Sequence, residues 1–172
     1  LTLSRLESYS LAAIETQPIN LSALAGQLLQ EAQTLSKGRH HISHQTAPDI
    51  WVEGIQTDLY SALSNLVFNA VRYTPEGGNI DLTLARGEDA QQQPVAVFSV
   101  RDSGSGIAAE HIPRLTERFY RVDAGRSRQS GGTGLGLAIT KHALAEHQGT
   151  LDIQSEVGVG STFSAIVPLK AG

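Results

Sequence analysis

The chain has 172 residues, of which 40% are hydrophobic, and a formal net charge of −4 at pH 7. This length and composition suit one domain with a proper hydrophobic core, whereas a general nucleic-acid binder would be expected to be basic. The absence of cysteine excludes disulfides, thiol catalysis and Cys-based zinc sites.

The sequence contains no methionine, so we expect the chain to be a fragment or a processed product rather than a natural start at Leu1. No apolar run approaches the length that spans a bilayer, and there is no signal peptide with a basic start. We therefore expect any membrane attachment to lie outside this chain. The lack of cysteine also fits a reducing compartment.

The first elements are predicted to be two helices. Residues 1–14 place apolar side chains among charged ones, as at the end of a helix that began upstream, and Gln17-Pro18 ends it because proline disfavours helix in the preceding residue. Asn20 caps a second, amphipathic helix over residues 21–35, which Lys37-Gly38 stops. Its expected buried stripe is Leu21, Leu24, Leu28, Leu29 and Ala32.

Two short strands are predicted next, at residues 40–46 and 50–53, joined by a turn at residues 47–49. The first of these strands carries three histidines, and imidazole is the commonest metal ligand. No carboxylate is placed to complete a metal site. We therefore expect a solvated polar strand rather than a metal centre at His40, His41 and His44.

A longer helix is predicted over residues 55–73, with a buried stripe formed by Leu59, Leu63, Leu66, Val67 and Val71. Asn65 and Asn69 lie one turn apart on an adjoining face. Asparagine is a poor choice for a helix interior, so two in register imply that their amides have partners. An amide oxygen is a ligand suited to Mg²⁺. The alternative is a pair of core amides bonded to neighbouring backbone.

The strand at residues 94–102 alternates, so that its last residue, Asp102, points inward with Ala96, Phe98 and Val100. A carboxylate is costly to bury unless something donates to it. The two glycines that follow, Gly104 and Gly106, allow backbone to approach a ligand closely. This pattern indicates an acceptor at the bottom of a cleft, suited to the amino edge of a purine. An ordinary Asp/Ser/Gly turn explains the same residues about as well.

A second glycine cluster, GGTGLGLAI at residues 131–139, runs directly into the apolar pattern of another helix. The unpaired backbone N–H groups and the positive end of the helix dipole at such a turn bind phosphate. The cluster is neither a P-loop nor a dinucleotide-binding fingerprint, and a flexible hinge before a helix is the alternative. Three further alternating strands are predicted at residues 79–86, 150–155 and 161–168.

Residues 114–131 fit no regular element and carry five arginines, Arg114, Arg118, Arg121, Arg126 and Arg128. A long irregular connection in a compact domain is usually a functional lid or disordered. Arginine pairs with phosphate oxygens through two parallel hydrogen bonds and would offset the charge of a triphosphate. A solvated charged loop is the alternative for two or three of these arginines.

Five separated motifs together resemble the ATP-binding half of sensor histidine kinases, over residues from about 18 to 168. Residues 65–75 resemble the family's N box, and residues 102–107 resemble the box that holds adenine. Residues 117–121 resemble the F box, residues 132–139 the second glycine box and residues 156–163 the closing motif. Residues 111–123, followed by Arg126-Ser-Arg, are especially similar to the phosphate-regulon sensor kinases, which implies a role in phosphate sensing.

The resemblance implies an α/β two-layer sandwich of the Bergerat ATP-binding type, with a mixed, mostly antiparallel sheet, helices on one face and an ATP lid. Residues 1–14 would be the tail of the dimerisation and phosphoacceptor helix, residues 15–20 a linker, and residues 21–172 the catalytic domain. Ser103 and Ser105 depart from the residues usual in the family. Both keep a small polar group, so we expect nucleotide binding to survive.

The resemblance also assigns residues to ATP and Mg²⁺. Asp102 would accept a hydrogen bond from the adenine amino group, and Tyr73 would pack on the ring. Asn69 would ligate Mg²⁺ with Asn65 nearby, and Arg72 would reach toward phosphate. The other expected nucleotide contacts are Gly104, Gly106, Ile107, Tyr120, Arg121, Arg126, Arg128, Gly132, Thr133, Gly134, Leu135, Gly136, Leu137 and Thr162.

The family's phosphoacceptor is a histidine followed by an acidic residue and shortly after by proline, and none of the six histidines has this context. We therefore expect the γ-phosphoryl group to pass to a dimerisation domain of the same protein, for relay to a response-regulator aspartate. The implied parent is a homodimer in the bacterial inner membrane, with this part in the cytoplasm and touching neither nucleic acid nor membrane. Another ATPase or serine kinase of the superfamily, or a non-catalytic nucleotide-binding module, is the alternative.

Overall fold

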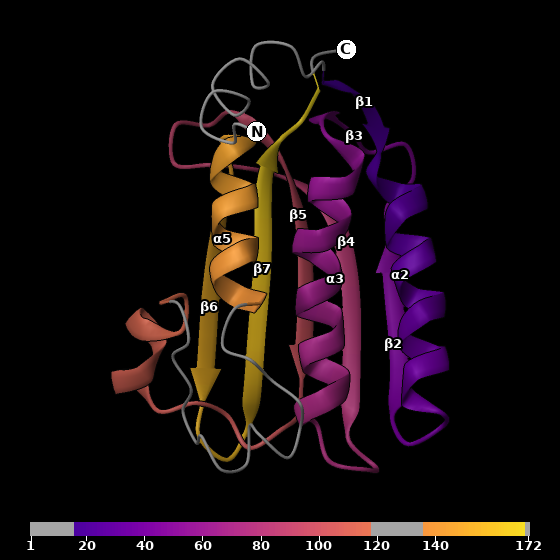
Figure 1. Cartoon of the computed structure of the whole chain (residues 1–172), viewed down its shortest axis with the longest axis vertical. Helices are drawn as coiled ribbons and strands as arrows, with labels where there is room; N and C mark the ends of the chain where they lie inside the picture. The colour runs from indigo at the N-terminus through magenta and orange to yellow at the C-terminus, as the bar shows by residue number, and fades with distance from the viewer. Residues whose placement is uncertain (1–15, 118–135, 171–172) are drawn as a thin grey trace, which may run out of the picture.

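The computed structural model describes residues 16–117 and 136–170 (Figure 1). In chain order, its elements are β1 (Gln17–Asn20), α2 (Leu21–Ser36), β2 (His41–Thr46), β3 (Trp51–Gly54), α3 (Gln56–Tyr73), β4 (Asn79–Glu88), β5 (Pro94–Asp102), the short 3₁₀ helix η1 (Ala109–Arg114), α5 (Gly136–Glu146), β6 (Thr150–Glu156) and β7 (Gly160–Pro168). The helix predicted over residues 1–14 lies outside the described residues.

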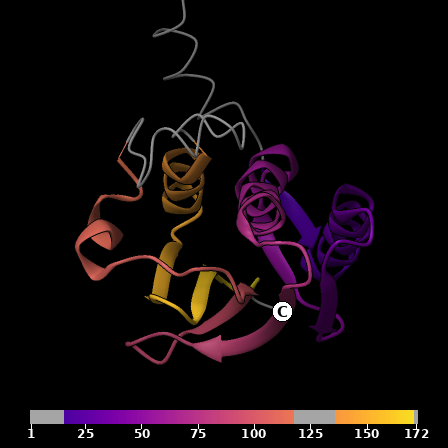
Figure 2. The same cartoon turned by 90° about the horizontal axis from the view of Figure 1, so that it is seen from below.

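The described elements form two layers, a five-stranded sheet and the helices that cover one of its faces. The strand order is β2-β4-β5-β7-β6, in which β2 and β4 run parallel and the other neighbours antiparallel. Seen from below, α2, α3 and α5 stand on one face of the sheet and leave the other face open (Figure 2). The predicted α/β two-layer sandwich with a mixed, mostly antiparallel sheet is therefore confirmed.

The core lies between the two layers because the strands alternate. Residues at intervals of two face the helices and are at most 3% exposed in the two central strands β4 and β5: Ile80, Leu82, Leu84, Ala96, Phe98 and Val100. Asp102 continues this series at the end of β5, so its side chain also faces the helical layer. The residues between them face the open side and include Asp81, Thr83, Ser99 and Arg101.

The amphipathic helix α2 begins and ends as its sequence predicts. Asn20 Oδ1 accepts a hydrogen bond from the Ala23 N–H, 3.1 Å away, and the helix stops at Lys37, which takes a left-handed conformation with φ of 55°. The buried stripe differs at one position. Leu29 is only half-buried, and Ala25 is buried in addition to the other predicted residues, because the face that α2 turns to the core is slightly rotated.

The helix α3 supplies the middle of the helical layer and contacts both α2 and α5. The five residues of its predicted apolar stripe, Leu59, Leu63, Leu66, Val67 and Val71, are each at most 2% exposed. The same helix carries Asn65 and Asn69 beside this stripe. Neither α3 nor any other helix in the described residues is both long and apolar enough to cross a membrane.

The structure differs from expectation at residues 17–20, which form the strand β1 instead of part of a linker. β1 pairs antiparallel with β3, and the paired residues Ile19 and Val52 are at most 3% exposed. The strands β2 and β3 follow each other as predicted but belong to different sheets, since β2 pairs with β4 and β3 with β1. Such partners are chosen by tertiary packing rather than by local sequence.

The solvated polar strand expected at the three histidines is wrong for His40, which precedes β2 and is half-buried. Its Nε2 lies 2.7 Å from the Thr74 carbonyl oxygen and its Nδ1 lies 2.8 Å from Ser36 Oγ. Because a carbonyl only accepts, Nε2 must carry a proton. His40 thus joins the end of α2 to the residue that follows α3.

No group of three or more His, Cys, Asp or Glu side chains in residues 16–117 and 136–170 could hold a metal ion.

A substitution at Gly160 tests the packing between the start of β7 and the end of β5. Its φ is +145°, and a Cβ there would overlap the Asp102 carbonyl oxygen. We expect Gly160→Ala to lower the free energy of unfolding by about 2 kcal/mol or more, since backbone strain and backbone overlap act together. Urea unfolding of the purified chain measures this loss.

Gly26→Ala is the matched control for that experiment. Gly26 lies inside α2, with nothing within 4 Å of the missing Cβ, so alanine there should raise the free energy of unfolding by about 0.5–1 kcal/mol. A Gly160→Ala protein as stable as the parent would contradict the contact between β7 and the end of β5.

Candidate nucleotide-binding site

Asp102 is a half-buried carboxylate at the end of the central strand β5. Its Oδ1 accepts a hydrogen bond from the Gly104 N–H at 2.9 Å. Burial raises the pKa of the Asp102 carboxyl above its ordinary value, and hydrogen bonds from the backbone N–H groups of Gly104 and Ser161 partly offset this. The carboxylate is thus incompletely compensated, and a further donor from a ligand would stabilise its charged form.

The loop after Asp102 is anchored to strands on both sides. Its hydrogen bonds run between Ser103 N–H and the Asn79 carbonyl (3.0 Å), Asn79 N–H and Ser103 Oγ (2.9 Å), Gly158 N–H and the Ser105 carbonyl (2.7 Å), and Ile107 N–H and Ser155 Oγ (2.7 Å). These bonds involve β4, β6 and the turn between β6 and β7. The loop therefore presents Asp102 from a well-supported edge of the sheet, and Ser103 keeps this support without the side chain usual in the family.

The two glycines of this loop lie close to the chain's own atoms. A Cβ on Gly104 would lie 3.1 Å from Asp102 Oδ1 and 3.6 Å from the Tyr73 carbonyl. Gly106 has φ of +79°, and a Cβ there would overlap the backbone of Glu156. In the structure, the close approach that we expected of these glycines is therefore made to Asp102 and to the turn between β6 and β7.

The last turn of α3 brings three predicted site residues together. Arg72 Nη1 donates to Asn69 Oδ1 at 3.1 Å, and the Arg72 guanidinium carbon lies 5.9 Å from the centroid of the Tyr73 ring. Tyr73 is 46% exposed. Because the Tyr73 carbonyl lies beside Gly104, this turn of α3 ends next to the Asp102 loop. An aromatic ring, a guanidinium and an amide oxygen are thus gathered at the end of α3 that lies next to the Asp102 loop.

Asn65 lies one turn earlier on α3 and faces α5. Its Nδ2 donates to the carbonyl of Gly136, the first residue of α5, at 3.1 Å. A bond from an asparagine amide to neighbouring backbone is what the sequence analysis gave as the alternative to a Mg²⁺ ligand. Gly136 and Leu137 therefore begin α5 against α3, with Leu137 partly buried against the core.

Thr162, expected among the nucleotide contacts, lies on the open face of the sheet. It pairs in register with Arg101, whereas its neighbour Ser161 pairs with Asp102 on the helical side and is 6% exposed. Ser161 Oγ lies 2.7 Å from Ser155 Oγ. Of these two residues, the structure therefore places Ser161 on the same side of the sheet as Asp102, and the nucleotide contact expected of Thr162 stays a prediction. The alternation with buried Phe163 could have shown this, because Ser161 and Phe163 are two residues apart.

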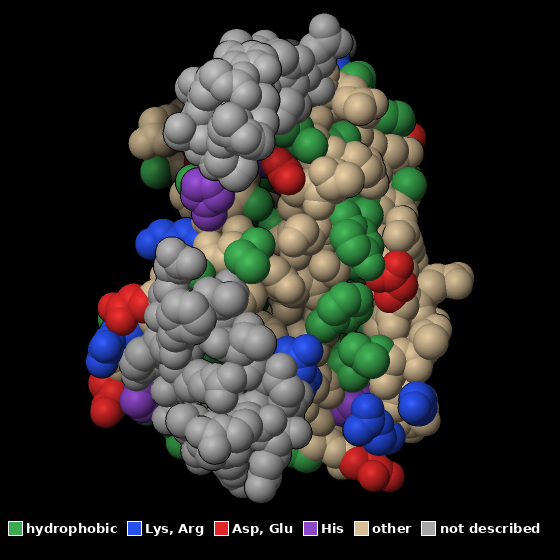
Figure 3. Space-filling model, in the orientation of Figure 1, with side chains coloured by type: hydrophobic (Ala, Val, Ile, Leu, Met, Phe, Trp, Pro, Cys, Tyr) green, Lys and Arg blue, Asp and Glu red, His purple; other side chains and the backbone are tan. Residues whose placement is uncertain are grey.

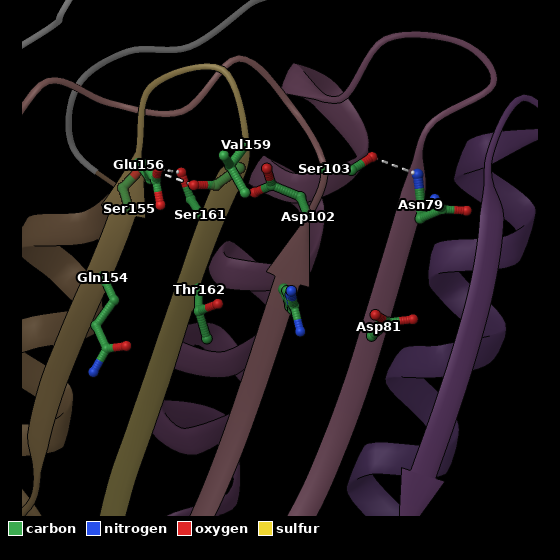
Figure 4. A pocket seen from close by; sticks show the side chains of 12 residues that line it. Asn79, Asp81, Asp102, Ser103, Gln154, Ser155, Glu156, Val159, Ser161 and Thr162 are labelled. Carbon is green, nitrogen blue, oxygen red and sulfur yellow. Dashed lines mark hydrogen bonds between the residues drawn. The ribbon is translucent and has the colours of Figure 1, made fainter.

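A hollow on the open face of the sheet illustrates this difference (Figure 4). It is lined by Asp81, Arg101, Gln154 and Thr162 and also by Asp102 and Ser161. Neither Asn69 nor Arg72 lines this hollow, so it does not connect Asp102 with the end of α3. The helical face is seen in Figure 3, with basic side chains at the lower ends of α2 and α3.

The remaining predicted contacts belong to the segment between η1 and α5. Residues 118–135 lie outside the described residues, and they include Tyr120, Arg121, Arg126, Arg128, Gly132, Thr133, Gly134 and Leu135. The described site therefore consists of the Asp102 loop, the last two turns of α3 and the first turn of α5. It offers a carboxylate acceptor at one end and amide and guanidinium groups at the other, which suits a nucleotide.

Comparison with known proteins agrees with this arrangement. Residues 54–171 match the family described as histidine kinase-, DNA gyrase B-, and HSP90-like ATPase. The chain is 48% identical over 151 residues to the phosphate regulon sensor protein PhoR of Pseudomonas aeruginosa, covering 87% of this chain and 33% of the relative. It is 40% identical over 166 residues to the protein of the same name from Haemophilus influenzae, covering 93% and 38%. The chain thus spans about a third of the length of these curated relatives.

Solved structures show the same fold. The mycobacterial sensor histidine kinase MprB superposes with a TM-score of 0.77 at 22% identity, covering 91% of this chain and 99% of that one. Full-length ShkA, solved in complex with AMPPNP, superposes with a TM-score of 0.75 at 27% identity, covering 91% and 32%. The family match extends over more than half of the chain and includes the whole of α3, the Asp102 loop and α5. The chain therefore belongs to the histidine kinase-, DNA gyrase B-, and HSP90-like ATPase family, as the ATP-binding domain that sensor histidine kinases contain.

Proposed function

We propose that this domain binds Mg²⁺–ATP and transfers the γ-phosphoryl group to a histidine on a dimerisation domain of the same protein. The observation that carries the proposal is the half-buried Asp102 carboxylate, with its raised pKa, beside the last turn of α3 that holds Asn69, Arg72 and Tyr73. The relatives named as phosphate regulon sensors support it. Phosphate sensing, relay to a response regulator and a homodimeric parent in the inner membrane, with this domain in the cytoplasm, are part of the same proposal.

The adenine end of the site would be read by Asp102. The carboxylate accepts from the amino group of adenine, which is a charge-assisted hydrogen bond in a partly desolvated place. Tyr73, exposed at the end of α3, would cover the ring. Guanine carries a carbonyl where adenine carries the amino group, so its oxygen would face the carboxylate without a proton between them. This arrangement would select ATP over GTP.

The metal end would be formed by α3. Asn69 Oδ1 is a hard oxygen ligand, and its only hydrogen bond within the described residues comes from the exposed Arg72 side chain, which could turn to phosphate. Mg²⁺ keeps several waters and takes one or two protein oxygens together with phosphate oxygens. A single asparagine therefore fits this ion, although no cluster of His, Cys, Asp or Glu side chains among the described residues could hold one.

The transfer itself asks little covalent chemistry of the domain. A nitrogen of the acceptor imidazole forms a bond to the γ-phosphorus, the bond from that phosphorus to the β–γ bridging oxygen breaks, and ADP leaves. The protein contributes mainly position and neutralisation of charge. Asn69 and Arg72 would hold the phosphates, and the glycine-rich segment before α5 would offer backbone N–H groups. None of these roles requires a general base in this domain.

The first prediction for this site concerns Asp102. Asp102→Asn should weaken ATP binding by about 2 kcal/mol or more, because a charge-assisted bond becomes a mismatched one. ATP binding to the parent chain should also weaken on acidification at a higher pH than for an ordinary aspartate, since the pKa of Asp102 is raised and only the ionised form is the full acceptor. Titration with a fluorescent ATP analogue measures both effects.

Asp81→Asn is the control for the change at Asp102. Asp81 is a carboxylate on the open face of the neighbouring strand, where it accepts from Ser43 Oγ, so its loss should leave ATP affinity unchanged. Equal affinities of the parent chain for GTP and ATP would overturn the role of Asp102.

The second prediction for this site concerns Asn69. Asn69→Ala should remove the Mg²⁺-dependent part of ATP affinity, about tenfold or 1.4 kcal/mol, and leave adenosine binding intact. Thermal stability should not fall, because alanine has the higher helix propensity and Asn69 Oδ1 bonds only to exposed Arg72 among the described residues. Calorimetric titration with and without Mg²⁺, together with thermal unfolding, checks this. A collapse in stability would show that the amide is structural.

The third prediction separates binding from transfer. The chain should bind ATP but acquire no acid-labile phosphate when incubated with Mg²⁺ and labelled nucleotide, because none of its histidines has the acceptor context. A separate dimeric helical fragment that carries the acceptor histidine should restore weak transfer, since the effective concentration supplied by a covalent linker is lost. Rapid labelling of the isolated chain at His111 or another of its histidines would place the acceptor inside this domain.

A further inference from the structure

The helices α3 and α5 are joined by hydrogen bonds at three levels. Near the site, Asn65 Nδ2 donates to the Gly136 carbonyl at 3.1 Å. In the middle, Thr140 Oγ1 donates to the Ala62 carbonyl at 2.9 Å, and Thr140 is fully buried. At the far end, the Ile55 N–H just before α3 donates to Nε2 of His147, just after α5, at 3.1 Å. The residue numbers rise along one helix as they fall along the other, so the helices run antiparallel.

These polar bonds fix the position of α5 more firmly than its apolar packing does. In the described part of α5, the buried residues are Thr140, Ala143 and Leu144, of which only two are apolar. A small apolar contact of this kind has no strong preference for one register, whereas each hydrogen bond needs one donor opposite one acceptor. The bond at Thr140 is buried and the bonds at Asn65 and His147 are partly buried, so each is costly to break. The three bonds therefore set the register and tilt of α5 on α3.

The bond at the far end specifies the state of the His147 ring. Because the Ile55 N–H can only donate, Nε2 must present its lone pair and carry no proton. Nδ1 then carries the proton and donates to the Ala143 carbonyl at 2.7 Å. The ring lies directly on Gly54, where a Cβ would be 2.6 Å from Nε2. A neutral imidazole of one tautomer is thus held between the two helix ends, with no room for a side chain at position 54.

The opposite ends of the same two helices form the candidate nucleotide site. Gly136, at the start of α5, follows the glycine-rich segment, while α3 carries Asn65 and Asn69 at that level. From Thr140 to His147 is about 10 Å along a helix and from Thr140 to Gly136 about 6 Å, at about 1.5 Å per residue. Loss of the bond at His147 would leave only the bonds at Thr140 and Gly136 to orient α5, so the helix could change its tilt on α3 and with it the direction in which Gly136 faces the site.

We propose that His147 is a positioning residue for the triphosphate end of the nucleotide site, acting through α5. Its neutral ring holds the end of α5 on the start of α3, and this sets how Gly136, at the other end of α5, lies against Asn65. The inference rests on the proposed function. It also predicts a selective effect, because the adenine end, formed by Asp102 on β5 and Tyr73 on α3, does not involve α5. Disturbing His147 should therefore weaken ATP binding and spare adenosine binding.

Two substitutions distinguish the contribution of His147 Nε2 from that of Nδ1. In His147→Gln, the amide oxygen can reach the position of Nε2 and accept from Ile55, whereas in His147→Asn the shorter amide reaches only the position of Nδ1. We expect His147→Asn to raise the Kd for Mg²⁺–ATP about tenfold with the adenosine Kd within twofold of the parent. His147→Gln should retain both affinities within about twofold. Calorimetric titration of the 172-residue chain with each ligand gives the two constants.

Tyr60→Phe is the matched control. Tyr60 lies on α3, and its hydroxyl donates to Glu31 Oε1 of α2 at 2.6 Å, so the change removes a bond between helices without touching α5. It should leave the ratio of the ATP and adenosine constants unchanged. If His147→Asn fails to fold, Thr140→Val removes the middle bond with little change of shape and should raise the ATP constant selectively in the same way.

The outcomes distinguish this inference from the proposed function. A parent chain that binds no ATP overturns the proposed function and this inference with it. A parent chain that binds ATP, with His147→Asn weakening ATP and adenosine equally or neither at all, overturns the inference alone. Nitrogen NMR of the parent chain gives an independent test, since the structure requires the proton of His147 on Nδ1, and a proton on Nε2 would overturn the arrangement.

Discussion

The inward direction of one carboxylate, Asp102, is the constraint on which the site depends. Alternation along β5 places it on the same face as the buried Phe98 and Val100, so a charge stands where the core ends. Burial raises its pKa, and two backbone N–H groups compensate for only part of the cost. An acceptor held in this state has a strong preference for a ligand that donates, and the position of that acceptor is set by the rigid centre of the sheet.

The surroundings of Asp102 are built to keep it there. The loop after β5 is bonded to β4 through Ser103 and to β6 through Ile107. Gly106 and Gly160 lie where any side chain would overlap the backbone of the neighbouring segment. These glycines therefore serve packing between the loop and the hairpin of β6 and β7, which brings Ser161 onto the same side as the carboxylate.

The helix α3 connects the two ends of the site. Its apolar stripe holds it on the sheet, its last turn lies beside the Asp102 loop, and its Asn65 side chain donates to the first residue of α5. Each polar contact with α5 joins residues far apart in sequence, so the spacing between the helices depends on tertiary structure throughout. In the function that we propose, the sheet would hold the base through Asp102 and the helices would hold the phosphates, with α3 shared by both.

Local periodicity was sufficient to predict much of this protein. The cap at Asn20, the buried stripe of α3, the four long strands and the inward direction of Asp102 follow from intervals of 3.6 and 2 residues, because these intervals fix side-chain direction before any tertiary contact forms. The same alternation, counted back from Phe163, would also have placed Ser161 rather than Thr162 on the Asp102 side of the sheet. The pairing of β1 with β3, the bond of His40 to Thr74 and the bond of His147 to Ile55 could not be predicted, since these partners lie 31 to 92 residues apart. The sequence around such a polar side chain does not specify its hydrogen-bond partner. Only the packing of separate elements decides which donor or acceptor lies next to it.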